Sequence, residues 1–239
     1  MKYLIIDCFN FTLIAYAVAK NSENPIDALP SILNSMLRRL ERDFPFHVLY
    51  GCWDTYGGTF FRKEKNPDYK ANRDHTLFDF KAVEAMDEVF AKHGVINIKV
   101  PECEADDAIY ILCQILKEEN PKNDITIVSR DKDLIQIVQN NYADRIWDVC
   151  KKQLIDIPNY SIVDYKCLVG DKSDGISGVA GIGKSTALKV LCGFKKLTEE
   201  QTRVFESCKD IIDTTRHPRF EEIKEYLKKE IEHDKKFDN

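Results

Sequence analysis

The hydrophobic and polar positions of the chain divide it into two kinds of segment. Four short runs are rich in Ile, Val and Tyr and have the length of buried strands, and segments with helical spacing of apolar residues separate them. The four runs are Tyr3–Ile6, Phe46–Gly51, Val95–Val100 and Ile125–Ser129. This alternation predicts an α/β fold with a mostly parallel, twisted sheet.

Helices are predicted between these runs and beyond the last of them. Their ranges are 26–42, 80–92, 105 onward, 161–169, 184–191 and 218–236, and residues 145–157 are predicted to form a strand or hairpin. From Ala105 the apolar residues fall on one helical face, and Ser161 has the side chain of an N-cap. The polar and basic stretch 55–76 lacks a core-facing pattern, so we expect it to be a mobile or binding loop.

Acidic side chains stand where apolar runs end. They are Asp7, Asp54, Glu104, Asp106, Asp107, Asp131, Asp133, Asp171 and Asp174. Each has a simpler explanation by itself, because acids in a first helical turn cap free N–H groups and a single Asp can end a strand or begin a turn. Paired acids nevertheless recur at 104–107, 131–133 and 171–174, and hard divalent cations bind carboxylate oxygens. The pattern predicts two Mg²⁺ or Mn²⁺ ions that clamp a scissile phosphate, at the edge where open α/β sheets bind ligands.

The distribution of charge favours a polyanionic partner in spite of the net charge. The formal net charge is −5 at pH 7, but the other residues sum to +4 once the nine acids above are left out of the count. Basic residues gather with aromatic ones between Phe60 and Arg73, and four lysines without an acid lie between 175 and 197. Such mixtures are typical of nucleic-acid contacts, although a charged run is more often a solvated loop. We expect a basic surface around an acidic hole.

The cysteines and the N-terminus indicate a protein of a reducing compartment. Eight cysteines lie singly without a C-x-x-C pair, which is typical of buried reduced thiols rather than of a zinc site. The stretch from Lys2 to Ala19 loosely imitates a signal peptide, but Asp7 and Asn10 interrupt it. Apolar runs stay shorter than the roughly 18 residues of a membrane span. We therefore expect a cytoplasmic protein.

A second motif keeps an alternative function open. The segment from Gly178 to Ser185 matches the P-loop pattern G-x-x-x-x-G-K-[ST], which indicates nucleotide binding. A P-loop follows a buried strand, however, whereas the residues before Gly178 are polar and turn-like. Glycine-rich backbone ahead of a helix can equally approach the phosphates of DNA. Both ligands remain open from these residues, with DNA favoured.

Six blocks of sequence occur in a characteristic order. They are LIID at 4–7, the segment around Asp54, RKEKNPDYKANR at 62–73, EADD at 104–107, SRDKD at 129–133 and GDKSDGISGVAGIG at 170–183. Together they resemble the flap endonuclease/5′-3′ exonuclease family, and the short chain looks most like its bacteriophage members. The resemblance implies a PIN-like nuclease domain over 1–157 with a helical arch at 55–78. A helical helix-three-turn-helix region that grips duplex DNA would follow over 158–239.

The resemblance also implies roles for individual residues. All nine acids would hold two divalent metals, directly or through water. Lys70 and Arg73 match arch residues that steer the scissile phosphate and stabilise its transition state. Tyr69 and Arg62 would support the 5′ strand.

A glycine hairpin is the last implied element of the site. It contains Gly178, Gly181, Ile182 and Gly183 and would bind backbone phosphate, and relatives often hold K⁺ there. The family loop commonly reads GIGxKTA, whereas here Lys184 comes one position early and Ser185 stands where the lysine usually is. We include both residues among the predicted DNA contacts.

The implied activity is that of a structure-selective 5′-nuclease. It would hydrolyse DNA at 5′ ends or flaps, and RNA primers paired with DNA, in replication or repair. The expected protein is a monomer that acts on DNA with replication proteins, away from membranes, in the cytoplasm of a bacterial host if it comes from a phage. The alternatives are an NTP-binding P-loop protein and a catalytically silent DNA-binding module of the same fold.

Overall fold

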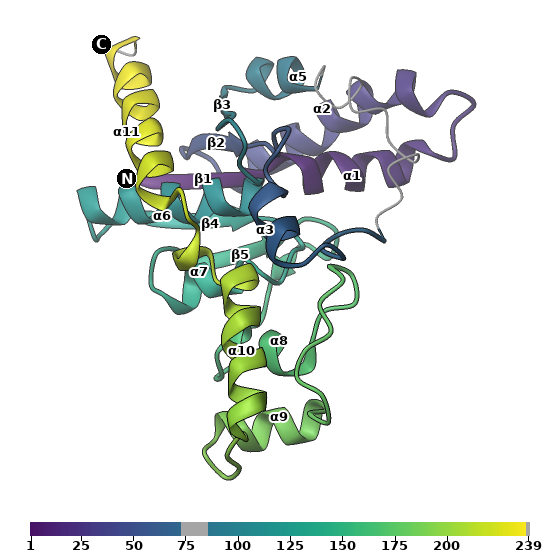
Figure 1. Ribbon diagram of the computed structural model, residues 1–239. Coiled ribbons are helices and arrows are strands. Elements are labelled where there is room, and N and C mark those ends of the chain that lie inside the picture. The colour runs from purple at the N-terminus through teal and green to yellow at the C-terminus, as the bar shows by residue number, and fades with distance from the viewer. Residues whose placement is uncertain (73–85, 238–239) are drawn as a thin grey trace.

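The fold is built on a six-stranded sheet with the strand order β3-β2-β1-β4-β5-β6 (Figure 1). The computed structural model describes residues 1–72 and 86–237. The strands are β1 (Lys2–Asp7), β2 (Val48–Cys52), β3 (Val95–Ile98), β4 (Asp124–Val128), β5 (Arg145–Asp148) and β6 (Gln153–Leu154). Strands β1 to β5 are parallel to one another, and β6 pairs with β5 in the antiparallel direction. The predicted mostly parallel sheet and the hairpin at 145–157 are confirmed.

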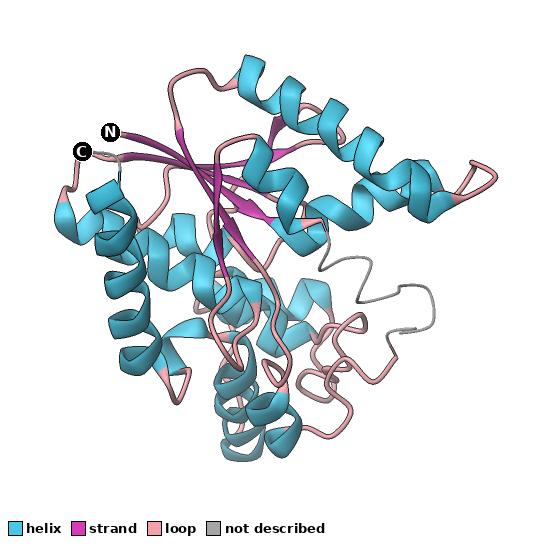
Figure 2. Ribbon diagram, turned by 90° about the horizontal axis from the view of Figure 1, so that it is seen from above, coloured by secondary structure: helices cyan, strands magenta, loops and turns pink. Residues whose placement is uncertain are grey.

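Helices cover both faces of the sheet. Successive residues of a strand point to opposite faces, so they pack with different helices. Leu4 and Ile6 pack with one group of helices, and Tyr3 and Ile5 pack with the other. The first group is α1 (Cys8–Ala19), α2 (Pro25–Asp43) and α5 (Asp87–Lys92); the second is α6 (Ala105–Glu119), α7 (Ile135–Gln139) and α11 (Phe220–Phe237). Figure 2 shows the twisted sheet between these layers.

A smaller group of helices projects from the sheet (Figure 1). It comprises α8 (Ile162–Val169), α9 (Lys184–Leu191) and α10 (Glu199–Ile212), and its core is formed by Leu168, Val179, Ile182 and Ala187. A 3-10 turn at Thr214–Arg216 then leads to α11, whose Ile223, Leu227 and Ile231 pack in the core beside α6. The C-terminal region is helical as predicted, but its last helix packs on the sheet domain. The boundary at 157 stays a prediction.

Most helices lie where the sequence predicts them. Helix α9 has the predicted bounds, and Ser161 caps α8 by accepting a hydrogen bond from the Asp164 N–H at 3.1 Å. Helices α3 (Phe60–Lys65), α7 and α10 are absent from the prediction. Residues 80–85 of the predicted helix 80–92 and residues 73–78 of the predicted arch lie outside the described residues. Among the helices of 1–72 and 86–237, none is both long and apolar enough to cross a membrane.

The segment 60–70 differs from the expected loop without core contacts. It begins with α3 (Phe60–Lys65), and the side chains of Arg62, Tyr69 and Lys70 are buried. Arg62 retains only 4% of its exposure, which a charged residue does only when carboxylates neutralise it. The pattern of apolar residues could not reveal this packing, because the buried groups are polar.

Candidate active site

Asp7 lies at the point where the chain leaves the sheet centre. It is the last residue of β1 and the N-cap of α1, where its carboxylate accepts hydrogen bonds from the Asn10 N–H at 3.0 Å and the Ser129 hydroxyl at 2.9 Å. β1 pairs with β2 on one side and β4 on the other, and the chain connections run in opposite directions from there. Open α/β sheets bind ligands at the carboxyl ends of strands at such a position.

Four carboxylates gather at this edge, and we call them the first acid group. They are Asp7, Asp54, Asp106 and Asp131. Burial, reinforced by the charges of Asp54 and Asp131, raises the pKa of Asp7 to about 7. Burial, with Asp131 and Asp7 next in importance, also raises the pKa of Asp106 well above its usual range. A bound cation can stabilise carboxylates that are buried together in this way, because it offsets both the burial of their charge and their repulsion.

Asp54 is the most exposed member of the first acid group, but it has a fixed position. Its carboxylate accepts a hydrogen bond from the Ala105 N–H at 3.0 Å, in the first turn of α6. The loop after β2 is thereby joined to the helix that carries Asp106. Only the family order supported Asp54 in the sequence, and the structure now adds its electrostatic contact with Asp7.

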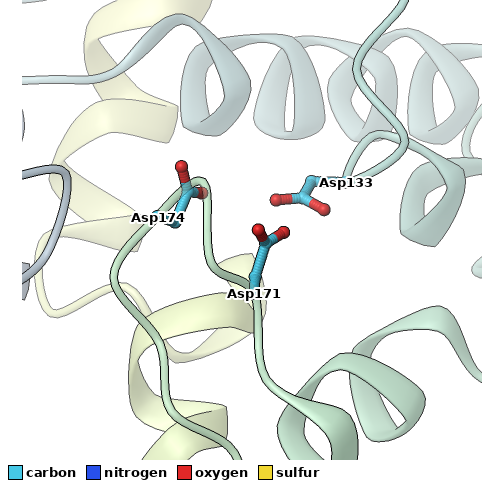
Figure 3. Close-up of side chains that lie close together, drawn as sticks. All are labelled: Asp133, Asp171 and Asp174. Atoms are coloured by element: carbon cyan, nitrogen blue, oxygen red, sulfur yellow. The ribbon is translucent and has the colours of Figure 1, made fainter. Parts of the chain in front are cut away.

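Three further carboxylates form a second acid group, which Figure 3 shows. Asp133, Asp171 and Asp174 each offer an oxygen, and these oxygens lie within 4.8 Å of one another. Asp133 belongs to the turn after β4, where its N–H donates to Asp131 of the first group at 2.9 Å. Asp171 and Asp174 belong to a tight turn that the bridge between Asp171 and Ile176 closes. Segments far apart in the sequence thus converge on a space suited to one cation.

Lys166 is a residue of the site that sequence reasoning missed. It lies in the last turn of α8, and its ammonium contacts the carboxylates of Asp133 and Asp171, the latter at 2.6 Å. Burial would raise the pKa of Asp171, but hydrogen bonds from Lys166 and Ser173 outweigh it and lower the pKa to about 2. The sequence carried one signal for this contact, because Lys166 lies about one helical turn before the acidic turn of Asp171 and Asp174.

Glu104 and Asp107 have a different environment from Asp106. Residues three apart share a face of a helix, so Glu104 and Asp107 point together toward α3 while Asp106 points elsewhere. The Arg62 guanidinium donates to both oxygens of Asp107 at 2.7 Å, to Glu104 at 2.5 Å and to the Ile211 carbonyl at 2.9 Å. All three ionic side chains are at most 5% exposed. This buried network favours structural roles for Arg62 and Asp107.

Lys70 and Tyr69 also bind the Glu104 carboxylate. The Lys70 ammonium contacts one carboxylate oxygen, and the Tyr69 hydroxyl donates to the other at 3.1 Å. Burial would raise the pKa of Glu104, but Lys70 and Arg62 outweigh it and lower the pKa to about 2. The charge of Lys70 also opposes the rise in the pKa of Asp106, so it acts on both acids. Tyr69 is 4% exposed, so its ring has little surface for a nucleotide, and Arg73 lies outside the described residues.

The glycine hairpin connects the second acid group with α9. Gly178 and Gly181 have φ values of 70° and 75°, which favour glycine, and Gly183 is the N-cap of α9. Ile182 packs in the small helical core at 5% exposure, whereas Lys184 and Ser185 are exposed. Helix α8 and a turn precede this segment rather than a strand. It therefore lacks the strand–loop–helix setting of a P-loop.

The sheet, the two acid groups and the glycine hairpin define the class of acid-rich α/β nucleases. A family model for the N-terminal resolvase-like domain of 5′-3′ exonucleases matches residues 2–164, and one for their C-terminal SAM fold matches residues 157–235. The chain therefore belongs to the 5′-3′ exonuclease family. This confirms the family that the order of the motifs indicated.

Curated relatives include both long and short proteins. DNA polymerase I of Lactococcus lactis is 34% identical over 189 residues, which cover 73% of this chain and 21% of the polymerase. The 5′-3′ exonuclease of Bacillus subtilis is 31% identical over 211 residues, which cover 80% of this chain and 69% of that protein. The chain thus spans about a fifth of the polymerase relatives and about two thirds of the stand-alone exonuclease.

Solved structures with the same fold come from T5 enzymes. A T5 5′-exonuclease with bound divalent zinc is similar over 97% of this chain and 93% of that chain, with a TM-score of 0.62 and 17% identity. A T5 flap endonuclease in complex with DNA and metal ions has a TM-score of 0.61 and 16% identity. The similarity confirms the predicted architecture.

Proposed function

We propose that the protein is a divalent-metal-dependent 5′-nuclease that hydrolyses DNA phosphodiester bonds at 5′ ends or flaps. The convergence of two acid groups at the carboxyl edge of the sheet, beside Lys70 and Lys166, is the observation that carries the proposal. Membership of the 5′-3′ exonuclease family supports it. Hydrolysis would leave a 5′-phosphate and a 3′-hydroxyl.

The donor set of the two acid groups fits Mg²⁺ or Mn²⁺. All the donors are carboxylate oxygens, which hard cations prefer, and the second group already places three of them within 4.8 Å. Ions bound there would supply positive charge for the phosphate and lower the pKa of an attacking water. We assign Asp7, Asp54, Asp106 and Asp131 to one ion, and Asp133, Asp171 and Asp174 to the other.

Glu104 and Asp107 have separate roles in the proposal. Glu104 holds Lys70, and we assign to it a contact with a metal ion or its water shell when Lys70 moves to a phosphate. Asp107 is the buried counter-ion of Arg62, since both of its oxygens accept from the guanidinium. Arg62 and Tyr69 would then support the 5′ strand indirectly, by positioning Glu104.

Lys70 is proposed to steer the scissile phosphate, together with Arg73. Its ammonium pairs with Glu104 and its charge acts on Asp106, so a side-chain movement away from Glu104 would bring it to an anion at the first acid group. A fixed cation beside the phosphate stabilises the charge that develops during hydrolysis.

The glycine hairpin is proposed to hold the DNA backbone. Exposed backbone at Gly181 and Gly183, the N-terminus of α9 and the exposed side chains of Lys184 and Ser185 offer donors to a phosphate. K⁺ at this hairpin is part of the same proposal. We further expect that the protein cleaves RNA primers, is a monomer and has replication partners. A phage origin and a cytoplasmic location are also expected.

The test uses end-labelled 5′-flap, gapped and RNA-primed duplexes with and without Mg²⁺. We expect metal-dependent cleavage by the wild-type protein and loss of cleavage in the double variant Asp131→Asn, Asp133→Asn, with flap binding retained. Asp148→Asn is a matched control, because Asp148 is as buried as Asp7 but belongs to neither acid group. Turnover by the double variant in Mg²⁺ would refute the mechanism.

Two outcomes would replace the proposal with an alternative. Flap binding by the wild-type protein without any metal-dependent cleavage would indicate a silent DNA-binding module. Tight ATP binding that is lost in Lys184→Ala would indicate a P-loop protein, against the structural setting of that segment. Binding to DNA should also weaken steeply with salt, because several phosphate contacts release counterions.

A further inference from the structure

Lys166 occupies the space between carboxylates of the second acid group. Its ammonium contacts Asp133 and Asp171, which come from the turn after β4 and the turn after α8. The three side chains are 16% to 18% exposed, so water reaches them only in part. Lys166 thus neutralises charge in the space where the donors for a cation converge.

A lysine ammonium and a divalent ion satisfy the same electrostatic need. Both offset the repulsion between carboxylates, but the two cations cannot contact the same oxygens together without repelling each other. The ammonium is tethered and bears one charge, whereas Mg²⁺ or Mn²⁺ bears two and requires several oxygens in its own coordination geometry. Metal binding at this group must therefore move Lys166.

The first acid group differs in this respect. Asp7 accepts hydrogen bonds from the Asn10 N–H and the Ser129 hydroxyl, which are neutral donors that a metal ion can leave in place. Lys70 pairs with Glu104, which belongs to neither acid group, and acts on Asp106 of the first group through its charge. Among the described residues, an ion at Asp7 consequently meets neutral hydrogen-bond donors rather than a lysine.

We propose that Lys166 is a built-in counter-ion of the second acid group, which a divalent metal displaces, so that this group binds metal more weakly than the first. This inference rests on the proposed metal-dependent function. The lysine stabilises the metal-free protein and sets the metal concentration at which the second group fills. Once displaced, its ammonium stays tethered to α8 beside the site, where a DNA phosphate can take the place of the carboxylates.

The variant Lys166→Met removes the ammonium and keeps much of the side-chain length. Lys166→Gln is a second variant that keeps polarity, in case the methionine disturbs folding. Lys209→Met is the matched control, because Lys209 is 20% exposed and pairs at 2.9 Å with Asp164, which lies on the same helix as Lys166. The control therefore removes a comparable ion pair outside both acid groups.

Isothermal titration with Mn²⁺ alone measures the two binding events without DNA or turnover. We expect a tight and a weak event in the wild-type protein, and a weak event that tightens at least about tenfold in both Lys166 variants. The tight event should stay the same, and Lys209→Met should match the wild type. Thermal melts should show the Lys166 variants less stable than the control in EDTA, with the difference abolished by saturating Mn²⁺.

The outcomes separate this inference from the proposed function. Unchanged or weaker binding at the second event in the Lys166 variants would overturn the inference, because the lysine would then be neutral to metal or needed to arrange the ligands. The proposed function would still stand in that case. Absence of any Mn²⁺ binding by the wild-type protein would instead overturn the function, and the inference with it.

Discussion

Replacement of Asp7 by Asn should stabilise the metal-free protein while abolishing cleavage. The Asp7 carboxyl has its pKa raised from an ordinary 3.8 to about 7, so the folded protein holds this proton more tightly than the unfolded chain does. The contribution of Asp7 to the stability of the metal-free protein must then fall as pH rises from about 4 to 7. A shift of about three units corresponds to about 4 kcal/mol at most, at 1.36 kcal/mol per unit.

The assay is urea unfolding in EDTA at pH 4, 5.5, 7 and 8 for the wild type and Asp7→Asn. The side-chain amide of the variant keeps an oxygen for the Asn10 N–H and carries no charge. The variant therefore lacks the free-energy cost that the ionised, buried carboxylate has above pH 7. We expect the two proteins to have similar free energies of unfolding near pH 4. The variant should become more stable by up to about 4 kcal/mol at pH 8.

In saturating Mg²⁺ the wild type should be more stable than Asp7→Asn, because metal binding at this carboxylate adds to the free energy of unfolding of the wild type alone. Asp148→Asn serves as the control, since it removes an equally buried carboxylate that accepts from the Cys150 N–H at 2.9 Å outside both acid groups. It should not stabilise the protein at any pH. A difference between the wild type and Asp7→Asn that stays constant from pH 4 to pH 8 would refute the electrostatic explanation.

Two further predictions concern the buried network and the glycine hairpin. Arg62→Met leaves Glu104 and Asp107 buried without their guanidinium, so urea unfolding should show a free energy of unfolding that is lower by about 3–5 kcal/mol. Arg62→Lys should recover part of this loss. Equal stability of Arg62→Met and the wild type would contradict the structural role of Arg62. Gly178→Ala would place a Cβ 2.3 Å from the backbone nitrogen of Gly170, whereas Gly181→Ala meets no atom within 4 Å. Both glycines have positive φ, so both variants lose about 1 kcal/mol to backbone strain, and thermal melts should show a clearly larger loss for Gly178→Ala.

The fold and the acid groups could be predicted because they depend on local patterns. Runs of β-branched residues determine the strands, and the topology rule for parallel sheets then brings residues after β1, β2 and β4 to one edge. The division of the 104–107 cluster follows from helix geometry, since neighbouring residues of a helix point about 100° apart. Helix α10 also had a signal, because Thr198 and Gln201 form the capping box at its start.

The charged partners could not be predicted in the same way. Arg62 begins the charged run RKEK, where a solvated side chain is the ordinary expectation, and the approach of α6 and α10 buries it. The sequence places Lys166 near Asp171, but its contact with Asp133 joins two segments that meet only in the folded chain. An ion pair depends on distances between segments, and sequence spacing does not encode those distances.

The burial of Arg62 also explains how the helical group is held in relation to the acids. Arg62 donates to the Ile211 carbonyl at the end of α10, and Asn66 and Lys70 donate to the carbonyls of Gly175 and Asp174 at 3.1 and 3.0 Å. The segment 62–70 therefore contacts α6, α10 and the turn of the second acid group at once. A solvated arginine could not fix this arrangement, because its long side chain samples many rotamers. DNA held at the proposed glycine hairpin would accordingly keep a defined position relative to both acid groups.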